Sequence, residues 1–274
     1  MSRAPAHSPT RTAESALEPI WHDLECGAYE ADIPLWRRLA AAARKHSGAP
    51  CDVLEIGCGT GRVSLALARG QWRVSALDAD PELAAELRER AEQRGLAIDV
   101  HVADARSFVI DSSFDLVLAP MLFAQLLDET ERRGMLSSIE RHLRPGARAA
   151  FALLELDEEW EADVAEAPPP DRMERDGWVY SSHAVAVRQI IDTNRIELDR
   201  VRRVTSPAGE LVAETLSRIP LELVSPAQLE AEGGAAGLVA EGRRRVNATQ
   251  EHVANTIVIL RKPATESVRS TSNG

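Results

Sequence analysis

Cysteine is scarce in this chain, and long apolar runs are missing. The 274 residues include three cysteines, an odd number without the spacing of a metal-binding set, so neither a disulfide framework nor a metal site is expected. No apolar run approaches the roughly 18 residues of a membrane span, and residues 1–12 hold no apolar core of a secretion signal. We therefore expect a reduced, cytoplasmic protein with no membrane partner. The cysteines are Cys26, Cys51 and Cys58.

Basic residues are also in deficit. The chain has 32 Lys and Arg against 43 Asp and Glu, which gives a formal net charge of −11. Proteins that bind nucleic acid usually present a basic face, because phosphate contacts supply most of their affinity. The arginine run at 243–245 is short, so a nucleic-acid partner is not expected. A local basic patch within the acidic total is the alternative left open.

Length and composition fit one α/β domain that carries an insertion. Hydrophobic residues make up 44% of the chain, enough to build a full core. The two ends differ, because small and polar residues dominate them. We expect a disordered leader at 1–16 and a disordered tail at 264–274.

Residues 53–61 carry the strongest functional signal. An apolar run that suits a buried parallel strand leads directly into a glycine-rich turn, and 62–69 reads as a helix. Such a turn brings bare backbone against a ligand. A dinucleotide fingerprint would need glycine at position 62, where Arg62 stands, and Glu55 would repel a pyrophosphate but suit a cationic ligand. The alternative is a simple tight turn. The glycines are Gly57, Gly59 and Gly61.

Three further features follow at the intervals of a doubly wound α/β fold. A second strand ends at Asp78, roughly 20 residues beyond the turn, where a ribose diol is usually held. A third strand, 97–102, precedes Asp104, and a fourth, 114–119, closes on Pro120. All three lie at carboxyl ends of strands, where open α/β sheets bind ligands. The alternatives are that Asp78 caps a helix, for which Asp80 is better placed, and that Asp104 is an ordinary loop acid.

With these four motifs in order, residues 51 to about 156 resemble the core of the class I S-adenosylmethionine-dependent methyltransferases. The resemblance implies a doubly wound, mostly parallel sheet of seven strands, an S-adenosylmethionine-binding core at 49–156, and S-adenosylhomocysteine as product. The glycine turn would line the methionyl and ribose side, Asp78 would accept from the ribose hydroxyls, and Asp104 from the adenine amino group. The implied cofactor-binding residues are Tyr29, Glu55, Gly57, Cys58, Gly59, Gly61, Asp78, Ala79, Asp104, Ala105, Ala119 and Pro120.

The segments around this core are expected to select the substrate. Residues 17–48 predict a helical lid that contains Tyr29, for which packing on the sheet edge is the alternative to cofactor contact. Residues 157–222 begin as an acidic, proline-containing linker, after which 178–191, 195–205 and 211–221 alternate like strands of an antiparallel meander. Residues 223–263 then predict a helix capped at Ser225 and two strands that complete the core sheet.

The meander resembles, in layout, the added sheet of small-molecule N- and O-methyltransferases. It would roof a substrate pocket, or form a homodimer interface, or both. The mechanism implied is in-line displacement at the sulfonium methyl by a nitrogen or oxygen of a small molecule, with no nucleic acid involved. Candidate bases are His22, Glu30 and His183. Candidate substrate-binding residues are Trp21, Gln125, Trp178, Tyr180 and Arg188.

Two functions from other classes remain open at this point. One is a nicotinamide-dependent oxidoreductase, against which Arg62 and the tripeptide 103–105 count. The other is a catalytically silent protein that binds the cofactor or a partner. Cofactor titrations and product formation from amines and phenols would separate the three.

Overall fold

The computed structural model describes residues 17–47, 50–154, 169–190, 193–249 and 253–264. The predicted leader, the acidic stretch at 155–168 and nearly all of the predicted tail therefore lie outside the described residues. No helix within the described ranges is long and apolar enough to cross a membrane.

The core is a seven-stranded sheet with the order β10-β11-β5-β4-β1-β2-β3. The five strands from β5 to β3 run parallel, and β11 is antiparallel to both of its neighbours. The expectation of a doubly wound, mostly parallel sheet is confirmed. The strands are β1 (Asp52–Ile56), β2 (Arg73–Asp78), β3 (Ile98–Val102), β4 (Phe114–Ala119), β5 (Leu143–Leu154), β10 (Val239–Val246) and β11 (Asn255–Arg261).

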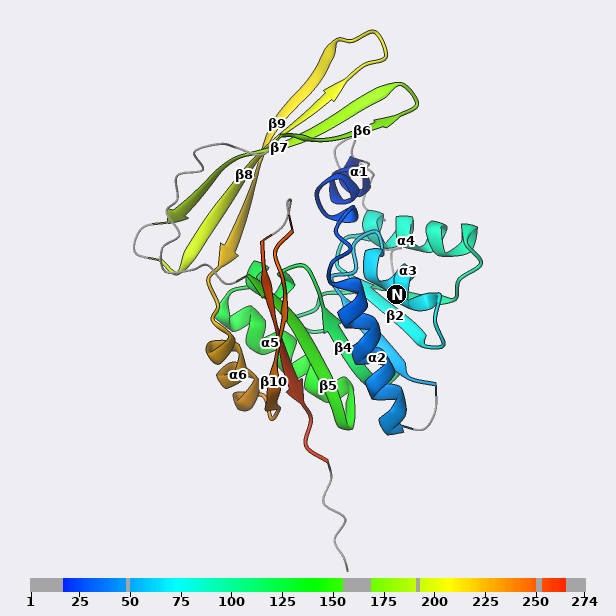
Figure 1. The fold of residues 1–274 in the computed structure, drawn as a ribbon, viewed down its shortest axis with the longest axis vertical. Helices are drawn as coiled ribbons and strands as arrows, with labels where there is room; N and C mark the ends of the chain where they lie inside the picture. Colours follow the sequence, from blue (N-terminus) through cyan, green and yellow to red (C-terminus); the bar gives the residue numbers. More distant parts are fainter. Residues whose placement is uncertain (1–16, 48–49, 155–168, 191–192, 250–252, 265–274) are drawn as a thin grey trace, which may run out of the picture.

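Helices cover both faces of this sheet (Figure 1). Leu54 and Ile56 of β1 pack on the face under α5 and α6, while Val53 packs on the face under α2 and α3. The strand alternates between two buried faces, which explains its continuous apolar sequence. The helices are α2 (Ile33–Ser47), α3 (Arg62–Ala68), α4 (Pro81–Gln93), α5 (Glu129–His142) and α6 (Pro226–Ala235).

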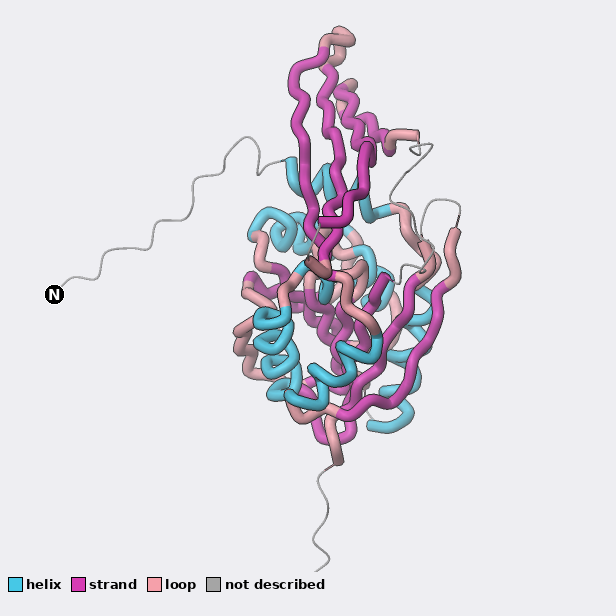
Figure 2. Tube along the Cα trace, turned by 90° about the vertical axis from the view of Figure 1, so that its left-hand side faces the viewer, coloured by secondary structure: helices cyan, strands magenta, loops and turns pink. Residues whose placement is uncertain are grey.

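An antiparallel sheet of four strands projects from one end of the core (Figure 2). Its strands are β6 (Asp171–Arg175), β7 (Trp178–Ile190), β8 (Arg195–Thr205) and β9 (Leu211–Glu222). The three predicted strands are present. The remaining strand, β6, was not predicted. Its sequence is short and polar and its residues are mostly exposed, so it shows no apolar alternation and falls within the predicted linker.

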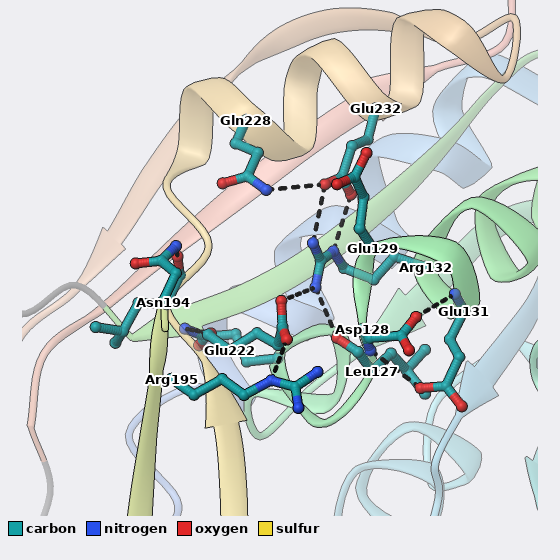
Figure 3. Close-up of polar contacts among 12 residues, drawn as sticks. Leu127, Asp128, Glu129, Glu131, Arg132, Asn194, Arg195, Glu222, Gln228 and Glu232 are labelled. Carbon is teal, nitrogen blue, oxygen red and sulfur yellow. Dashed lines mark hydrogen bonds and ion pairs between the residues drawn. The ribbon is translucent and has the colours of Figure 1, made fainter. Parts of the chain in front are cut away.

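A buried ionic cluster fixes the base of this antiparallel sheet to the core (Figure 3). Arg132 of α5 is fully buried and donates to both carboxylate oxygens of Glu232 on α6 at 2.9 Å. It also donates to the Leu127 carbonyl at 2.6 Å and lies 3.6 Å from Glu222, the last residue of β9. Glu222 pairs in turn with Arg195, the first residue of β8. Two of the inserted strands are thus held at one point.

The N-terminal segment lies between the core and the antiparallel sheet (Figure 1). It consists of α1 (Glu18–His22), a π-helical turn, η2 (Asp23–Gly27), and the loop of residues 28–32 that leads into α2. Trp21 packs edge-on against Tyr180 of β7 with ring centroids 5.8 Å apart. Glu25 accepts two hydrogen bonds from Arg202 of β8, at 2.8 and 2.9 Å. The N-terminal segment is therefore fastened to the inserted sheet as well as to the core.

Candidate functional site

The turn after β1 adopts the conformation that its glycines permit. Gly57 and Gly59 have φ of 65° and 52°, a region that L side chains rarely adopt. A Cβ atom on Gly57 would lie 2.2 Å from the ring of Phe123, and one on Gly59 would lie 2.0 Å from Nε2 of His22. The turn is therefore bare backbone approached closely by two side chains, Phe123 from the 3-10 helix η3 (Phe123–Leu126) and His22 from α1.

Asp78 ends β2 directly beside this turn. Its Oδ2 accepts from the backbone N–H of Gly59 at 2.8 Å, and its Oδ1 accepts from the N–H of Asp80 at 2.9 Å. Asp80, and not Asp78, caps α4. Since a carboxylate oxygen can accept more than one hydrogen bond, both oxygens of Asp78 retain capacity for the two hydroxyls of a diol. Ala79 follows at the same corner.

Asp104 follows β3, the next strand along the sheet. Its carboxylate is held by the guanidinium of Arg106, with Nε 2.9 Å from both oxygens, and it accepts the Arg106 backbone N–H at 2.8 Å. These bonds hold the pKa of the Asp104 carboxyl below its usual value. Arg106 also pairs with Glu131, and Ala105 beside it is buried. An adenine amino group bound at Asp104 would share that carboxylate with Arg106.

Glu55 supports the turn from inside the fold. It is only 3% exposed and accepts a hydrogen bond from the hydroxyl of Ser64 on α3. Burial raises the pKa of this carboxyl to about 7. The side chain of Cys58 is likewise buried, in agreement with a small side chain filling space in the turn.

The loop after β4 is strained. Ala119 is buried and is followed by Pro120, after which Met121 and Leu122 have φ of 52° and 61°. Two successive non-glycine residues in the left-handed region cost free energy that the surroundings must offset. Leu122 packs into the apolar cluster at the base of the antiparallel sheet, and Phe123 lies against the glycine turn. The strained residues Met121 and Leu122 therefore lie at the carboxyl edge of the sheet, next to the residue that contacts the glycine turn.

His22 is oriented by a chain of hydrogen bonds. Its Nδ1 lies 3.1 Å from the hydroxyl oxygen of Thr60, which donates to Asp23 at 2.7 Å. Arg90 of α4 donates to the same carboxylate at 2.9 Å. Because the single hydroxyl proton of Thr60 goes to Asp23, its oxygen accepts from His22, so the proton of His22 is on Nδ1. Burial lowers the pKa of His22, which leaves Nε2 as an unprotonated acceptor at Gly59.

Tyr29 and Glu30 follow η2 and have different surroundings. Tyr29 is buried, its hydroxyl accepts from Asn255 at 3.3 Å, and its ring lies beneath the guanidinium of Arg62. Glu30 is exposed. Packing at the sheet edge thus accounts for Tyr29 in this structure, and contact with a cofactor stays a prediction.

The candidates for substrate binding have different surroundings among the described residues. Trp21 and Tyr180 are buried against each other, with Trp178 packed on the same cluster. Arg188 pairs with Glu197 at 3.0 Å and Asp199 at 2.6 Å on the neighbouring strand. His183 is partly buried on β7, in register with Val201.

Gln125 is engaged by backbone. It is fully buried, its side-chain oxygen accepts from the N–H of Leu154 at 2.7 Å, and its side-chain nitrogen donates to the carbonyls of Glu222 and Leu154 at 3.0 and 3.3 Å. Gln125 therefore fastens the ends of β5 and β9 together. A role in orienting the substrate would require it to release these bonds.

Sequence reasoning missed several residues at this edge. Asp23 and Thr60 orient His22, and Phe123 lies on the glycine turn. Thr60 stands inside the glycine motif, which is a usable local signal. Nothing local indicates that His22 approaches a residue 38 positions later, or that Met121 and Leu122 take left-handed backbone.

Two comparisons address the core sequence. Residues 53–146 match the family model described as "Methyltransferase domain". The cypemycin N-terminal methyltransferase of Streptomyces sp is 39% identical over 101 residues, which are 35% of this chain and 39% of that protein. A ribosomal protein L11 methyltransferase of Myxococcus xanthus is 28% identical over 159 residues, 55% of this chain and 54% of that protein. The matches thus span little more than half of these curated relatives at most.

Solved structures match nearly the whole fold. An amino pentose methyltransferase of Micromonospora echinaspora, solved with S-adenosylmethionine bound, superposes with a TM-score of 0.66 at 17% identity, covering 94% of this chain and 100% of that one. A sugar N-methyltransferase of Streptoalloteichus sp gives 0.68 at 16%, covering 96% and 98%. At this identity the likeness shows the fold. Together with the domain match, it confirms the resemblance to class I S-adenosylmethionine-dependent methyltransferases that the motifs indicate.

Proposed function

We propose that this methyltransferase domain makes the protein an S-adenosylmethionine-dependent enzyme that methylates a nitrogen or oxygen of a small molecule. The observation that carries the proposal is the hydrogen bond between Asp78 and the N–H of Gly59. This bond joins Asp78, whose carboxylate can accept hydrogen bonds from a diol, to the glycine turn. Both lie at the carboxyl edge of a parallel sheet, where open α/β sheets bind ligands. Arg62 stands where a dinucleotide loop needs glycine and is buried in an ion pair with Asp32, which counts against a nicotinamide cofactor.

The residues present suit this cofactor. Asp78 and Asp104 supply separate carboxylates for a ribose diol at one end and an exocyclic amine at the other. The side chains of His22 and Phe123 approach the glycine turn, the carboxylate of Asp78 lies beside it, and an acidic surround favours a cationic ligand. When bound, the cofactor would supply a methyl group on a positively charged sulfur, which is a good leaving group.

We propose an amine as the acceptor. The proteins of similar fold include an amino pentose and a sugar N-methyltransferase, and a sequence relative is an N-terminal methyltransferase. In the transfer, the nitrogen lone pair forms the new bond to the methyl carbon, and the carbon–sulfur bond breaks with its electrons remaining on sulfur. The chain's main contribution is alignment of the two reactants. The Nε2 atom of His22, held unprotonated by its bond to Thr60, would accept the proton that the nitrogen releases.

Cofactor titration tests the first half of this proposal. By isothermal titration calorimetry we expect saturable binding of S-adenosylmethionine and S-adenosylhomocysteine and none of NADH. The second half is tested with a panel of amino sugars, peptides with free N-termini and phenols, with methylated products detected by mass spectrometry. Binding of NADH alone would refute the cofactor assignment, while cofactor binding without any product would favour the silent protein.

We propose that the antiparallel sheet roofs the acceptor site. Its support is that the inserted sheet contacts α1 and the strained loop after Pro120, which both border the glycine turn. His183→Ala and Tyr180→Phe should change the apparent affinity for the acceptor or its turnover, with an unchanged dissociation constant for S-adenosylhomocysteine. Replacement of residues 178–220 by a short Gly/Ser linker should abolish turnover and keep cofactor binding within about tenfold. Wild-type behaviour of both point variants, with the sheet buried between two subunits, would identify it as a dimer interface instead.

A further inference from the structure

A cavity lies against the helical layer formed by α2, α3 and α4. Its volume is about 660 Å³, within the range of roughly 300–1,000 Å³ that is usual for small-molecule sites. The N-terminal segment contributes Gly27, Ala28 and Glu30 to its lining, and β6 contributes Met173. Thr60 of the glycine turn lines the cavity, whereas Gly57, Gly59 and Asp78 do not, so the cavity lies beside the site assigned to the cofactor.

The lining of this cavity is cationic in an acidic protein. Five arginines face two carboxylates, Asp23 and Glu30, whereas the whole chain has a formal net charge of −11. A positively charged lining in a negatively charged protein raises the local concentration of anions at the cavity. The arginines are Arg37 of α2, Arg62 and Arg69 at the two ends of α3, and Arg90 and Arg94 at the end of α4.

Three of these five cations have no carboxylate partner in the described part of the chain. Arg62 is paired with Asp32, and Arg90 with Asp23 and Glu86. Within the described ranges, Arg37 donates to one backbone carbonyl, that of Ala66, at 3.3 Å. Neither Arg69 nor Arg94 forms an ion pair with any residue in the described ranges. Arg37 lies on α2, and Arg69 and Arg94 directly follow α3 and α4. All three are exposed and line one cavity, an arrangement suited to phosphate oxygens, which accept forked hydrogen bonds from arginine.

One part of the lining is apolar. Ile33 and Pro34 of α2, Leu65 and Ala66 of α3, and Met173 of β6 contribute to the same cavity. A ligand that carried only phosphate would leave this surface uncovered. A flat ring would cover it, and Glu30 could accept a hydrogen bond from a hydroxyl or amino group on the ring system.

We propose that this cavity binds a phosphate-bearing small molecule with a ring, the chemistry of a nucleoside diphosphate, at Arg37, Arg69 and Arg94. The wall between this cavity and the glycine turn includes Asp23 and Thr60, which orient His22.

The test uses the full chain saturated with S-adenosylhomocysteine, so that the cofactor's adenine position is already filled. Calorimetric titration at low ionic strength with uridine diphosphate, pyrophosphate and uridine separates the phosphate contribution from the ring contribution. We expect saturable binding of uridine diphosphate, weaker binding of pyrophosphate, and none of uridine. The double variant Arg69→Gln/Arg94→Gln should weaken uridine diphosphate binding at least about tenfold while leaving the affinity for S-adenosylhomocysteine unchanged.

The matched control is Arg133→Gln/Arg203→Gln, which removes the same charge from two exposed arginines outside the cavity. It should bind uridine diphosphate like wild type. Absence of saturable binding at millimolar ligand, or equal binding by the two double variants, would overturn the proposal. Tighter binding of a short single-stranded oligonucleotide than of uridine diphosphate would also overturn it, in favour of a nucleic-acid strand.

Discussion

Arg62 and Asp32 form an ion pair in which the two side chains are only 8% and 3% exposed. The pair joins the first residue of α3, directly after the glycine turn, to the loop that leads into α2. Arg62 also donates to the carbonyl of Tyr29 at 2.7 Å, and Asp32 accepts from the indole of Trp36 at 2.8 Å. The position that departs from the dinucleotide fingerprint therefore anchors the N-terminal segment to the core.

Asp32→Asn should destabilise the fold strongly, because it leaves the buried guanidinium of Arg62 without a counter-charge. Loss of one partner from a buried pair typically costs about 3–5 kcal/mol, measured here as the free energy of unfolding in urea. The control is Glu214→Gln, which breaks a pair with Arg203 whose side chains are 50% and 45% exposed. That change should cost less than about 1 kcal/mol. Equal losses would show that burial of the first pair contributes nothing.

Asp78→Ala should weaken binding of S-adenosylhomocysteine by roughly 1.5–3 kcal/mol, because the ribose hydroxyls lose their acceptor. Calorimetry gives the dissociation constant, and circular dichroism checks that the fold survives. Asp99→Ala, at a carboxylate on β3 that is 70% exposed, serves as control and should bind like wild type. An unchanged dissociation constant for the Asp78 variant would remove the ribose assignment.

Thr60→Val should break the hydrogen-bond chain that links His22 to Asp23, with little change in side-chain volume. The Nδ1–H group of His22 would be left buried without an acceptor, at a cost of about 1–3 kcal/mol in unfolding free energy. If His22 accepts the substrate proton, the maximal turnover rate should fall more than the affinity for the cofactor, since the ring loses its orientation. Thr215→Val, at an exposed position of β9, should change neither quantity. Loss of stability with wild-type turnover would leave Thr60 a purely structural residue.

Glu55 gives the protein a pH dependence of defined sign. Burial raises its pKa from 4.5 to about 7, so between these values the folded state holds a proton that the unfolded state has released. Stability therefore falls as pH rises through this window, by at most about 1.4 kcal/mol per pH unit, and levels off above it. Glu55→Gln should abolish that decline and gain stability relative to wild type as pH rises. Urea unfolding across the window measures both slopes, and parallel slopes would contradict the assignment.

The core fold could be predicted because its signals are local and regularly spaced. Apolar runs end at Gly57, Asp78 and Pro120, and the carboxyl ends of parallel strands must meet at one edge. The structure accordingly brings Asp78 and the glycine turn into direct hydrogen-bond contact.

The surroundings of that edge could not be predicted in the same way. The position of Gln125 after the fourth strand suggested a polar group that faces the substrate. The backbone groups of Leu154 and Glu222 need hydrogen-bond partners where β5 and β9 end, and the side-chain amide of Gln125 supplies them. His22 forms its hydrogen bond with Thr60 only because α1 lies over the glycine turn. Such contacts depend on how distant segments approach, and no periodicity in the sequence encodes them.

The attachment of the N-terminal segment to the inserted sheet has a consequence for the order of folding. Glu25 and Arg202 are 177 residues apart in the chain, and closing so long a loop is entropically costly until much of the fold exists. The strands β1, β2, β3 and β4 are all synthesised by residue 119, whereas Tyr180, the partner of Trp21, is synthesised much later. We expect amides of α1 to gain protection from hydrogen exchange after those of β1 and β4 during refolding, so that the first α-helix of the described residues is among the last to become ordered.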